Sequence, residues 1–242
     1  MGTGFLFGYR LPGENYQDNV YSIYLVSNKH VLKDLSYVYL RFNPQGGQPA
    51  QNHKLDILVG SVNLFKQHPN DGVDVAVVGI SQPYIDNLVK SGVSLDFITF
   101  DNESFLIKDL KSLETTEGDG VFVLGYPMGI VGNTRQYVIL RGGVIARIHD
   151  MLEGFNTDFI IDAPVFPGNS GGPVIIKPEL TSIEGTKANK ESRLIGLVKS
   201  YIPYSDVAIS PQTGRPRVVF EENTGLTNVE PVDYIIETIL QN

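Results

Sequence analysis

The 242-residue sequence contains no cysteine, which excludes disulfide bonds, metal–thiolate sites and a cysteine nucleophile. Basic residues are also scarce, because 19 Lys and Arg stand against 27 Asp and Glu and give a net charge of -8. A nucleic-acid-binding chain needs Lys and Arg to displace counterions from phosphates, so this balance argues against a nucleic-acid partner. The fold must be held together by packing alone, and a hydrophobic content of 42% allows a sizeable core.

Long hydrophobic runs are missing as well. No stretch of 18 apolar residues occurs, so the sequence predicts no membrane-spanning helix. Met1 is followed at once by Gly-Thr-Gly-Phe, without the basic and apolar regions that a secretory signal needs. The cytoplasm is therefore the expected location, and a leader outside the given sequence is the alternative.

Short segments rich in β-branched and aromatic residues recur along the chain, and this pattern is typical of a barrel or sandwich. The length allows two small β-barrels of about 100 residues each. Leucine spacing predicts short helices at residues 84–90 and 105–113, and isoleucines after Pro231 predict a C-terminal helix packed on the second barrel. The expected strands are residues 5–7, 20–26, 55–59, 62–65, 75–80, 121–126, 137–140, 144–148, 159–161, 173–176 and 194–201. The expected turns and loops are residues 12–15, 43–52 and 177–193, and a bulge or tight bend is expected at residues 141–143.

One stretch, residues 166–173, reads Phe-Pro-Gly-Asn-Ser-Gly-Gly-Pro and holds a serine among glycines. A serine hydroxyl is a poor nucleophile at neutral pH, so it needs a base, a group that orients the base, and donors for the developing oxyanion. Gly168 and Gly171 can adopt positive φ or approach a substrate closely, which lets backbone N–H groups converge on one point. The same residues are ordinary turn residues, so a plain hairpin loop is the alternative interpretation of Ser170.

Two further polar residues stand at the ends of predicted strands. His30 follows the strand at residues 20–26 in a segment that can form one helical turn, and histidine titrates close to neutral pH, as a general base requires. Asp74 opens the strand at residues 75–80, so its carboxylate is expected at a barrel rim within reach of a histidine. Asp71 lies in Asn-Asp-Gly and is assigned to a hairpin turn. A surface histidine and a strand-end cap are the alternatives for the first two. The other histidines are expected to be structural or solvated: His53, His68 and His149.

These residues together resemble the trypsin-like serine peptidases. The order His30, Asp74, Ser170 is that of the chymotrypsin-type arrangement and differs from the orders in subtilisin and the α/β-hydrolases. The resemblance is closest to the cysteine-free bacterial branch that includes the HtrA-like proteases, although no peptide-binding PDZ domain is expected after the peptidase domain. The matching segments cover nearly the whole chain and are residues 2–5, 21–31, 73–78, 118–127, 161–163 and 167–173.

The resemblance implies an all-β fold of two six-stranded antiparallel β-barrels with a C-terminal helix, divided into halves at residues 1–110 and 111–242. It also implies a serine endopeptidase that acts through an acyl-enzyme intermediate, without a metal or other cofactor. Ser170 would be the nucleophile, His30 the base and Asp74 the residue that orients the base. The N–H groups of Gly168 and Ser170 would bind the oxyanion.

The implied partner is a polypeptide substrate, and the oligomeric state is left open. A pocket wall at Pro164 and Val165 would favour a small or apolar side chain. The strand residues Lys199, Ser200 and Tyr201 would line the channel and pair with an extended peptide. Lys199 departs from the family, which often has a small polar residue there. The main rival is a peptide-binding module that kept the fold and lost turnover. An esterase is the less favoured third candidate.

Overall fold

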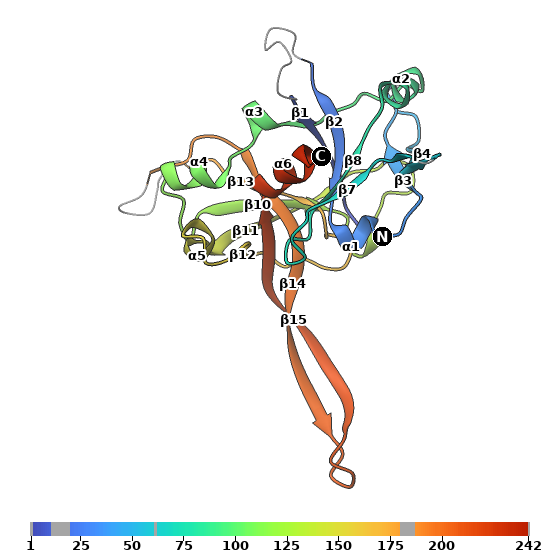
Figure 1. The fold of residues 1–242 in the computed structure, drawn as a ribbon. Coiled ribbons are helices and arrows are strands. Elements are labelled where there is room, and N and C mark those ends of the chain that lie inside the picture. The colour runs from blue at the N-terminus through green and yellow to red at the C-terminus, as the bar shows by residue number, and fades with distance from the viewer. Residues whose placement is uncertain (1, 11–19, 61, 180–186, 242) are drawn as a thin grey trace.

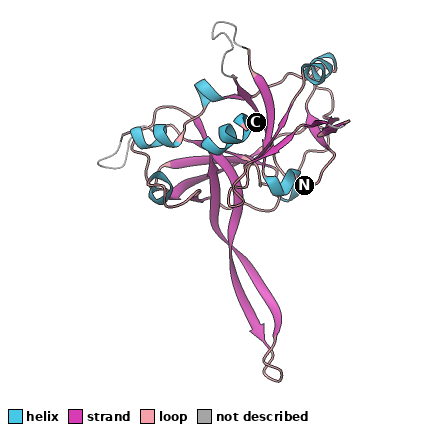
Figure 2. Ribbon diagram, in the orientation of Figure 1, coloured by secondary structure: helices cyan, strands magenta, loops and turns pink. Residues whose placement is uncertain are grey.

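The computed structural model describes residues 2–10, 20–60, 62–179 and 187–241. Strands are the predominant secondary structure of this part of the chain, and the helices are short (Figure 2). The turn expected at residues 12–15 and the central part of the loop expected at residues 177–193 lie outside the described residues. Among the residues that are described, no helix is long and apolar enough to cross a membrane.

The first half of the chain forms an open, mostly antiparallel sheet around its most apolar strands. The sheet order is β7-β8-β2-β1-β9, and the edge strand β9 pairs in parallel with β1. This five-stranded sheet does not close into a six-stranded barrel, because β3 and β4 pair only with each other and form a separate hairpin. The strands are β1 (Phe5–Tyr9), β2 (Ser22–Ser27), β3 (Tyr37–Phe42), β4 (Gln51–Asp56), β5 (Leu58–Val59), β6 (Val62–Asn63), β7 (Phe65–Gln67), β8 (Ala76–Gly79) and β9 (Ile98–Thr99).

The second half forms a closed six-stranded barrel, which confirms the all-β class. Its strand order is β10-β11-β12-β15-β14-β13. Alternate residues of β10 face the core, where Val121 and Val123 are fully buried, as expected for a strand with one face inside a barrel. The strands are β10 (Gly120–Gly125), β11 (Ile139–Arg147), β12 (Phe159–Asp162), β13 (Pro173–Ile176), β14 (Arg193–Ile209) and β15 (Pro216–Pro231).

The bend predicted at residues 141–143 is wrong, because β11 runs through them without a break. Gly142 and Gly143 pair with Phe122 and Val121 of β10. A side chain at residue 143 would collide with the carbonyl oxygen of Asp162 on β12. This glycine therefore permits a close approach of two strands, and the irregularity in the β11–β12 register lies further along, between Ile145 and Arg147.

The C-terminal helix α6 (Asp233–Leu240) begins after Pro231, as predicted. It does not pack on the second barrel alone. Ile235 and Ile239 join a cluster that contains Val75 and Val77 of the first half and Leu197 of β14 (Figure 1). The helix therefore fastens the two halves together. The other helices, which include the two that leucine spacing predicted, are α1 (Lys29–Leu32), α2 (Gln82–Lys90), α3 (Phe100–Glu103), α4 (Ile107–Ser112), α5 (His149–Leu152) and the 3-10 helix η1 (Pro127–Gly129).

Strands β14 and β15 extend far beyond the barrel. The sequence predicts a strand that ends at Tyr201, but β14 continues to Ile209 and returns as β15 from Pro216. The two strands leave the body as one long hairpin that projects into solvent (Figure 1). Neither β13 nor β12 pairs with this outer part.

Candidate active site

His30 and Asp74 are held together by neighbouring strands. Strands β2 and β8 pair antiparallel, so the segment after Ser27 and the segment before Ala76 meet at one edge of the sheet. His30 Nδ1 lies 2.5 Å from Asp74 Oδ2. The backbone N–H of His30 also donates to Asp74 Oδ1 at 3.2 Å. The Asp74 carboxylate thus fixes both the position of residue 30 and the orientation of its ring.

A side chain from the turn before α1 supports the aspartate. Asn28 is buried and donates its Nδ2 to the carbonyl oxygen of Asp74 at 2.7 Å. The side chain of Asp74 is 20% exposed and that of His30 is 53% exposed. The imidazole can therefore be reached from solvent, while its carboxylate partner lies behind it. Asp71 is exposed in the turn between β7 and β8, where Gly72 donates its N–H to the side chain of Asn70, and this confirms its assignment to the turn.

Ser170 lies in the loop between β12 and β13, and Thr3 holds this loop in place. The Thr3 hydroxyl donates to the carbonyl oxygen of Gly168 at 2.6 Å and accepts the N–H of Tyr126 at 3.1 Å. The Thr3 N–H donates to the carbonyl oxygen of Ser170 at 2.9 Å. Residue 3 is buried, so these bonds are shielded from water. Thr3, in the Gly-Thr-Gly-Phe segment, therefore ties the serine loop to the first half.

The glycines of the loop are required by its backbone. Gly168 has φ +103 and Gly171 has φ +82, a region that other residues adopt only with strain. A side chain at position 168 would collide with the carbonyl oxygen of Tyr126, and one at position 171 would collide with Thr3 and Ser27. Because Ser27 ends β2, the loop that carries Ser170 docks at the strand end from which the chain leads into His30. The structure thus brings the loop of Ser170 against the strand end that leads into His30, although no hydrogen bond joins the Ser170 and His30 side chains within the described residues.

The loop also presents backbone donors. The N–H groups of Gly168 and Ser170 have no hydrogen-bond acceptor within the described part of the chain, whereas those of Asn169, Gly171 and Gly172 are all used. Two nearby N–H groups left unpaired around a half-buried serine can bind a negatively charged oxygen.

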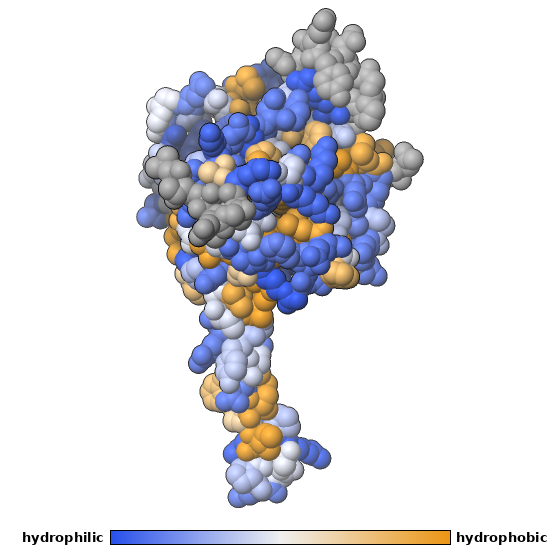
Figure 3. Space-filling model, turned by 90° about the vertical axis from the view of Figure 1, so that its left-hand side faces the viewer, coloured by the Kyte–Doolittle hydropathy of each residue, from blue (hydrophilic) through white to orange (hydrophobic). Residues whose placement is uncertain are grey.

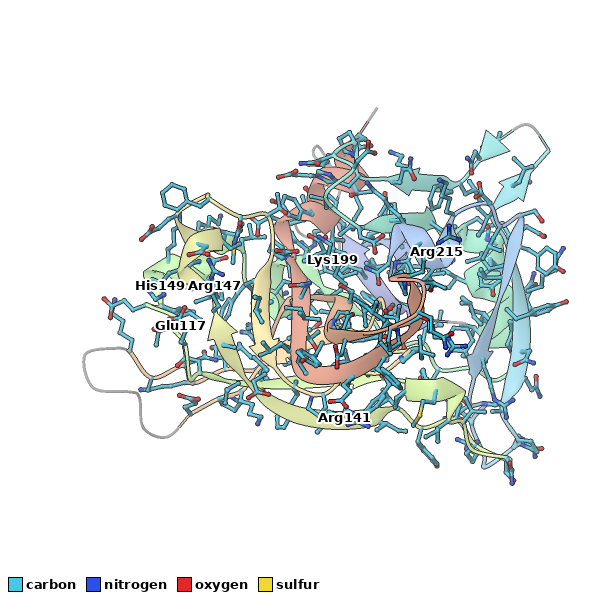
Figure 4. All side chains as sticks on the ribbon, turned by 90° about the horizontal axis from the view of Figure 1, so that it is seen from below. Glu117, Arg141, Arg147, His149, Lys199 and Arg215 are labelled. Atoms are coloured by element: carbon cyan, nitrogen blue, oxygen red, sulfur yellow. The ribbon has the colours of Figure 1, made fainter. Side chains whose placement is uncertain are left out.

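A buried ion pair lies directly behind Asp74. Glu230, at the end of β15, is fully buried and accepts the N–H of Asp74 on Oε1 at 2.8 Å. The ammonium of Lys199 contacts the same oxygen at 3.0 Å and also reaches Asp158 Oδ2 at 2.9 Å and the carbonyl oxygen of Gly72 at 2.8 Å. Figure 4 places Lys199 toward the middle of the molecule, away from Glu117 and His149 at its edge.

This arrangement shifts the pKa of both partners. Burial raises the pKa of Glu230, while the hydrogen bond from Asp74 and the ammonium of Lys199 oppose that rise. Burial tends to lower the pKa of Lys199, but its contacts with Asp158 and Glu230 outweigh burial and raise it. The sequence analysis missed Glu230 and Asp158; a glutamate between Val229 and Pro231 in an apolar segment was the available signal.

The candidate substrate residues occupy different environments. Pro164 and Ser200 are exposed, and Tyr201 is half-buried against the barrel core. Val165 is 2% exposed and belongs to that core, so its side chain does not form a pocket wall as expected. The ammonium of Lys199 points toward Glu230 and Asp158, so the side chain of Lys199 serves the network behind Asp74 and does not face the channel.

Two of the other histidines pair with carboxylates. His68 is buried, with Nε2 at 2.9 Å from Glu237 of α6 and its ring against Tyr234. His149 is exposed and pairs with Glu117 at 2.8 Å. In the described segments, no group of three or more His, Cys, Asp or Glu side chains is arranged to hold a metal ion.

Comparison with known proteins assigns the chain to a family. No curated protein matches the chain. The model of the trypsin-like peptidase domain matches residues 2–177, which include His30, Asp74 and Ser170. That match spans well over half of the 242 residues. The chain therefore belongs to the trypsin-like peptidase domain family.

Proposed function

We propose that the protein is a serine endopeptidase with Ser170 as nucleophile, His30 as general base and Asp74 as the residue that orients the base. The observation that carries the proposal is the 2.5 Å contact between His30 Nδ1 and Asp74 Oδ2. This contact favours the tautomer with a proton on Nδ1, so that Nε2 is free to accept the proton of a serine hydroxyl. The active-site cleft would lie between the halves at residues 1–110 and 111–242.

The reaction would run in two steps, formation of an acyl-enzyme and its hydrolysis. Ser170 Oγ attacks the carbonyl carbon of the peptide while its proton moves to His30, and the oxyanion is bound by the N–H groups of Gly168 and Ser170. His30 then gives that proton to the departing amine as the C–N bond breaks, which leaves an acyl-enzyme. Water attacks the ester, His30 accepts the proton of the water and returns it to Ser170, and the carboxylic acid leaves.

The substrate would bind as an added strand. Beyond Val198 the outer edge of β14 has no strand partner among the described residues, so the backbone of Lys199, Ser200 and Tyr201 can pair with an extended peptide. Pro164 would contribute to the exposed part of the side-chain pocket.

A serine-directed fluorophosphonate probe tests the proposal, because the probe reacts only with an activated hydroxyl. Labelling is expected in the parent protein and in the control variants Ser192→Ala and His53→Ala, and it should be lost in Ser170→Ala and His30→Ala. If the parent protein is folded and binds peptides but takes no label, it is a peptide-binding module and the proposal is wrong.

A further inference from the structure

The outer part of the β14–β15 hairpin, residues 203–223, meets the rest of the described chain only at its base, where Asn223 Nδ2 donates to the carbonyl oxygen of Val165 at 2.5 Å. Its strands pair only with each other, from Pro203 opposite Asn223 to Ile209 opposite Pro216. We call this segment the arm. A two-stranded hairpin alone is only marginally stable in water, so an arm of this length calls for a partner.

The arm exposes apolar side chains on both of its faces. Figure 3 shows hydrophobic residues gathered over its outer part. Residues that lie opposite each other on the two strands share a face, which puts Val207 with Val219 and Ala208 with Val218. The large apolar side chains of the arm are between 40% and 61% exposed, namely Tyr204, Val207, Ile209, Val218, Val219 and Phe220.

Both edges of the arm are also free. A strand edge with unpaired N–H and C=O groups is a template for another strand. On the β15 edge the sequence reads Arg217, Val218, Val219, Phe220, Glu221, with a cation and an anion placed symmetrically around a central valine. When this segment is aligned with its own reverse, each charged residue faces the opposite charge and each apolar residue faces another apolar residue.

We propose that the arm pairs with the arm of a second copy of this chain, through antiparallel contact of the two β15 edges about a two-fold axis at Val219. In this register Arg217 of each copy lies opposite Glu221 of the other, and Val218 lies opposite Phe220. Opposite charges and apolar pairs directly across strands stabilise a sheet. A two-fold contact uses the same patch on both copies, which requires this kind of self-complementarity.

The β14 edge does not offer the same match. About Val207, the same operation would place Asp206 opposite Ala208 and Ser205 opposite Ile209, without an ion pair. Because the paired strands run antiparallel, the two barrels would lie at opposite ends of the four-stranded ribbon.

The charge pairs give a reciprocal test by sedimentation velocity of the full chain. The parent protein should dimerise, and Arg217→Glu or Glu221→Arg should each weaken the dimer about 10- to 30-fold, because two attractive cross-strand pairs become repulsive. Mixing the two variants should restore the dimer, because every pair is then again between opposite charges. Arg147→Glu changes the same charge on β11 and should have no effect. A parent protein that stays monomeric, or a dimer indifferent to Arg217→Glu, would overturn the proposal.

The absence of cysteine supplies a second test. Val219→Cys would place two cysteines opposite each other on the two-fold axis, at a separation that suits a disulfide. Mild oxidation should give a covalent dimer on a non-reducing gel. Phe155→Cys is the matched control, because residue 155 is 79% exposed and lies outside the arm. Equal cross-linking of both variants would reflect random collision and contradict the pairing.

Discussion

Replacing Lys199 by methionine removes the ammonium that contacts Glu230 and Asp158 behind Asp74. Glu230 is 0% exposed, so its charge would keep only the hydrogen bond from the Asp74 N–H. Removing one partner of a buried ion pair typically costs about 3–5 kcal/mol. The Lys199 side chain is 21% exposed, so solvent already screens part of the interaction. We expect a loss of about 3 kcal/mol in the free energy of unfolding at neutral pH.

The pH dependence of this loss has a defined sign. Burial holds the pKa of Glu230 above its usual 4.5, and Lys199 opposes this. A carboxyl whose pKa is higher in the folded state destabilises the fold as pH rises from 4.5 through that folded pKa. Without Lys199 the folded pKa rises further. The variant should therefore differ little from the parent near pH 4 and lose most stability near pH 8.

Urea unfolding at both pH values measures this difference. The double variant Lys199→Met, Glu230→Gln should recover much of the loss, because no unpaired charge then stays buried. Lys187→Met removes an exposed ion pair with Glu114 and should cost at most about 1 kcal/mol. Two results would show that Lys199 does not neutralise a buried Glu230 charge. One is an equal loss of stability in Lys199→Met at both pH values. The other is a double variant whose loss equals the sum of the losses of Lys199→Met and Glu230→Gln measured separately.

Three further changes test other contacts. Glu117→Gln should lower the free energy of unfolding by roughly 1 kcal/mol above pH 4.5, and in thermal unfolding this difference should vanish as pH falls toward 2. Burial opposes ionisation of Glu117, but hydrogen bonds from the α5 backbone and from His149 lower its pKa to about 2, and partial exposure limits the effect on stability. Thr3→Val removes the hydrogen bonds of the Thr3 hydroxyl to Gly168 in the serine loop and to Tyr126 after β10, so stability should fall by about 2 kcal/mol and kcat for peptide hydrolysis with it; an unchanged kcat would show that the loop does not depend on them. Gly171→Ala should lose most probe labelling, because its side chain would collide with Thr3, whereas Gly154→Ala has a similar φ and open space and should keep labelling.

The sequence predicted the parts of the site that local patterns encode. His30 and Asp74 each stand beside an apolar strand, and the antiparallel pairing of β2 with β8 brings the two strand ends together. The glycines around Ser170 indicated positive φ, which the structure has at residues 168 and 171. Such signals lie within a few residues of the group they position, so they can be read from one sequence.

Contacts between distant segments were not readable in the same way. Lys199 joins Asp158 and Glu230 only because β14, β15 and the segment before β12 converge behind Asp74. Val165 precedes the serine loop closely enough to suggest a pocket wall, but the β-barrel closes over it and makes it core. The arm was not predicted, because its large apolar side chains are exposed and belong to no core within one chain. Apolar segments on either side of Pro-Gln-Thr-Gly were nevertheless a hairpin signal.

One strand, β14, connects the features that set this chain apart. Leu197 is buried where the two halves meet, Lys199 supports Asp74, Ser200 and Tyr201 line the proposed channel, and the arm follows. The β14–β15 register shifts between Val198 and Ser200 and again between Tyr201 and Pro203. A bulge bends a strand and interrupts its ladder. The shift between Tyr201 and Pro203 therefore separates the ladder of the arm from Lys199, which itself lies within the other shift. Dimerisation through the arm can therefore leave the geometry behind Asp74 unchanged, and the two properties can vary independently.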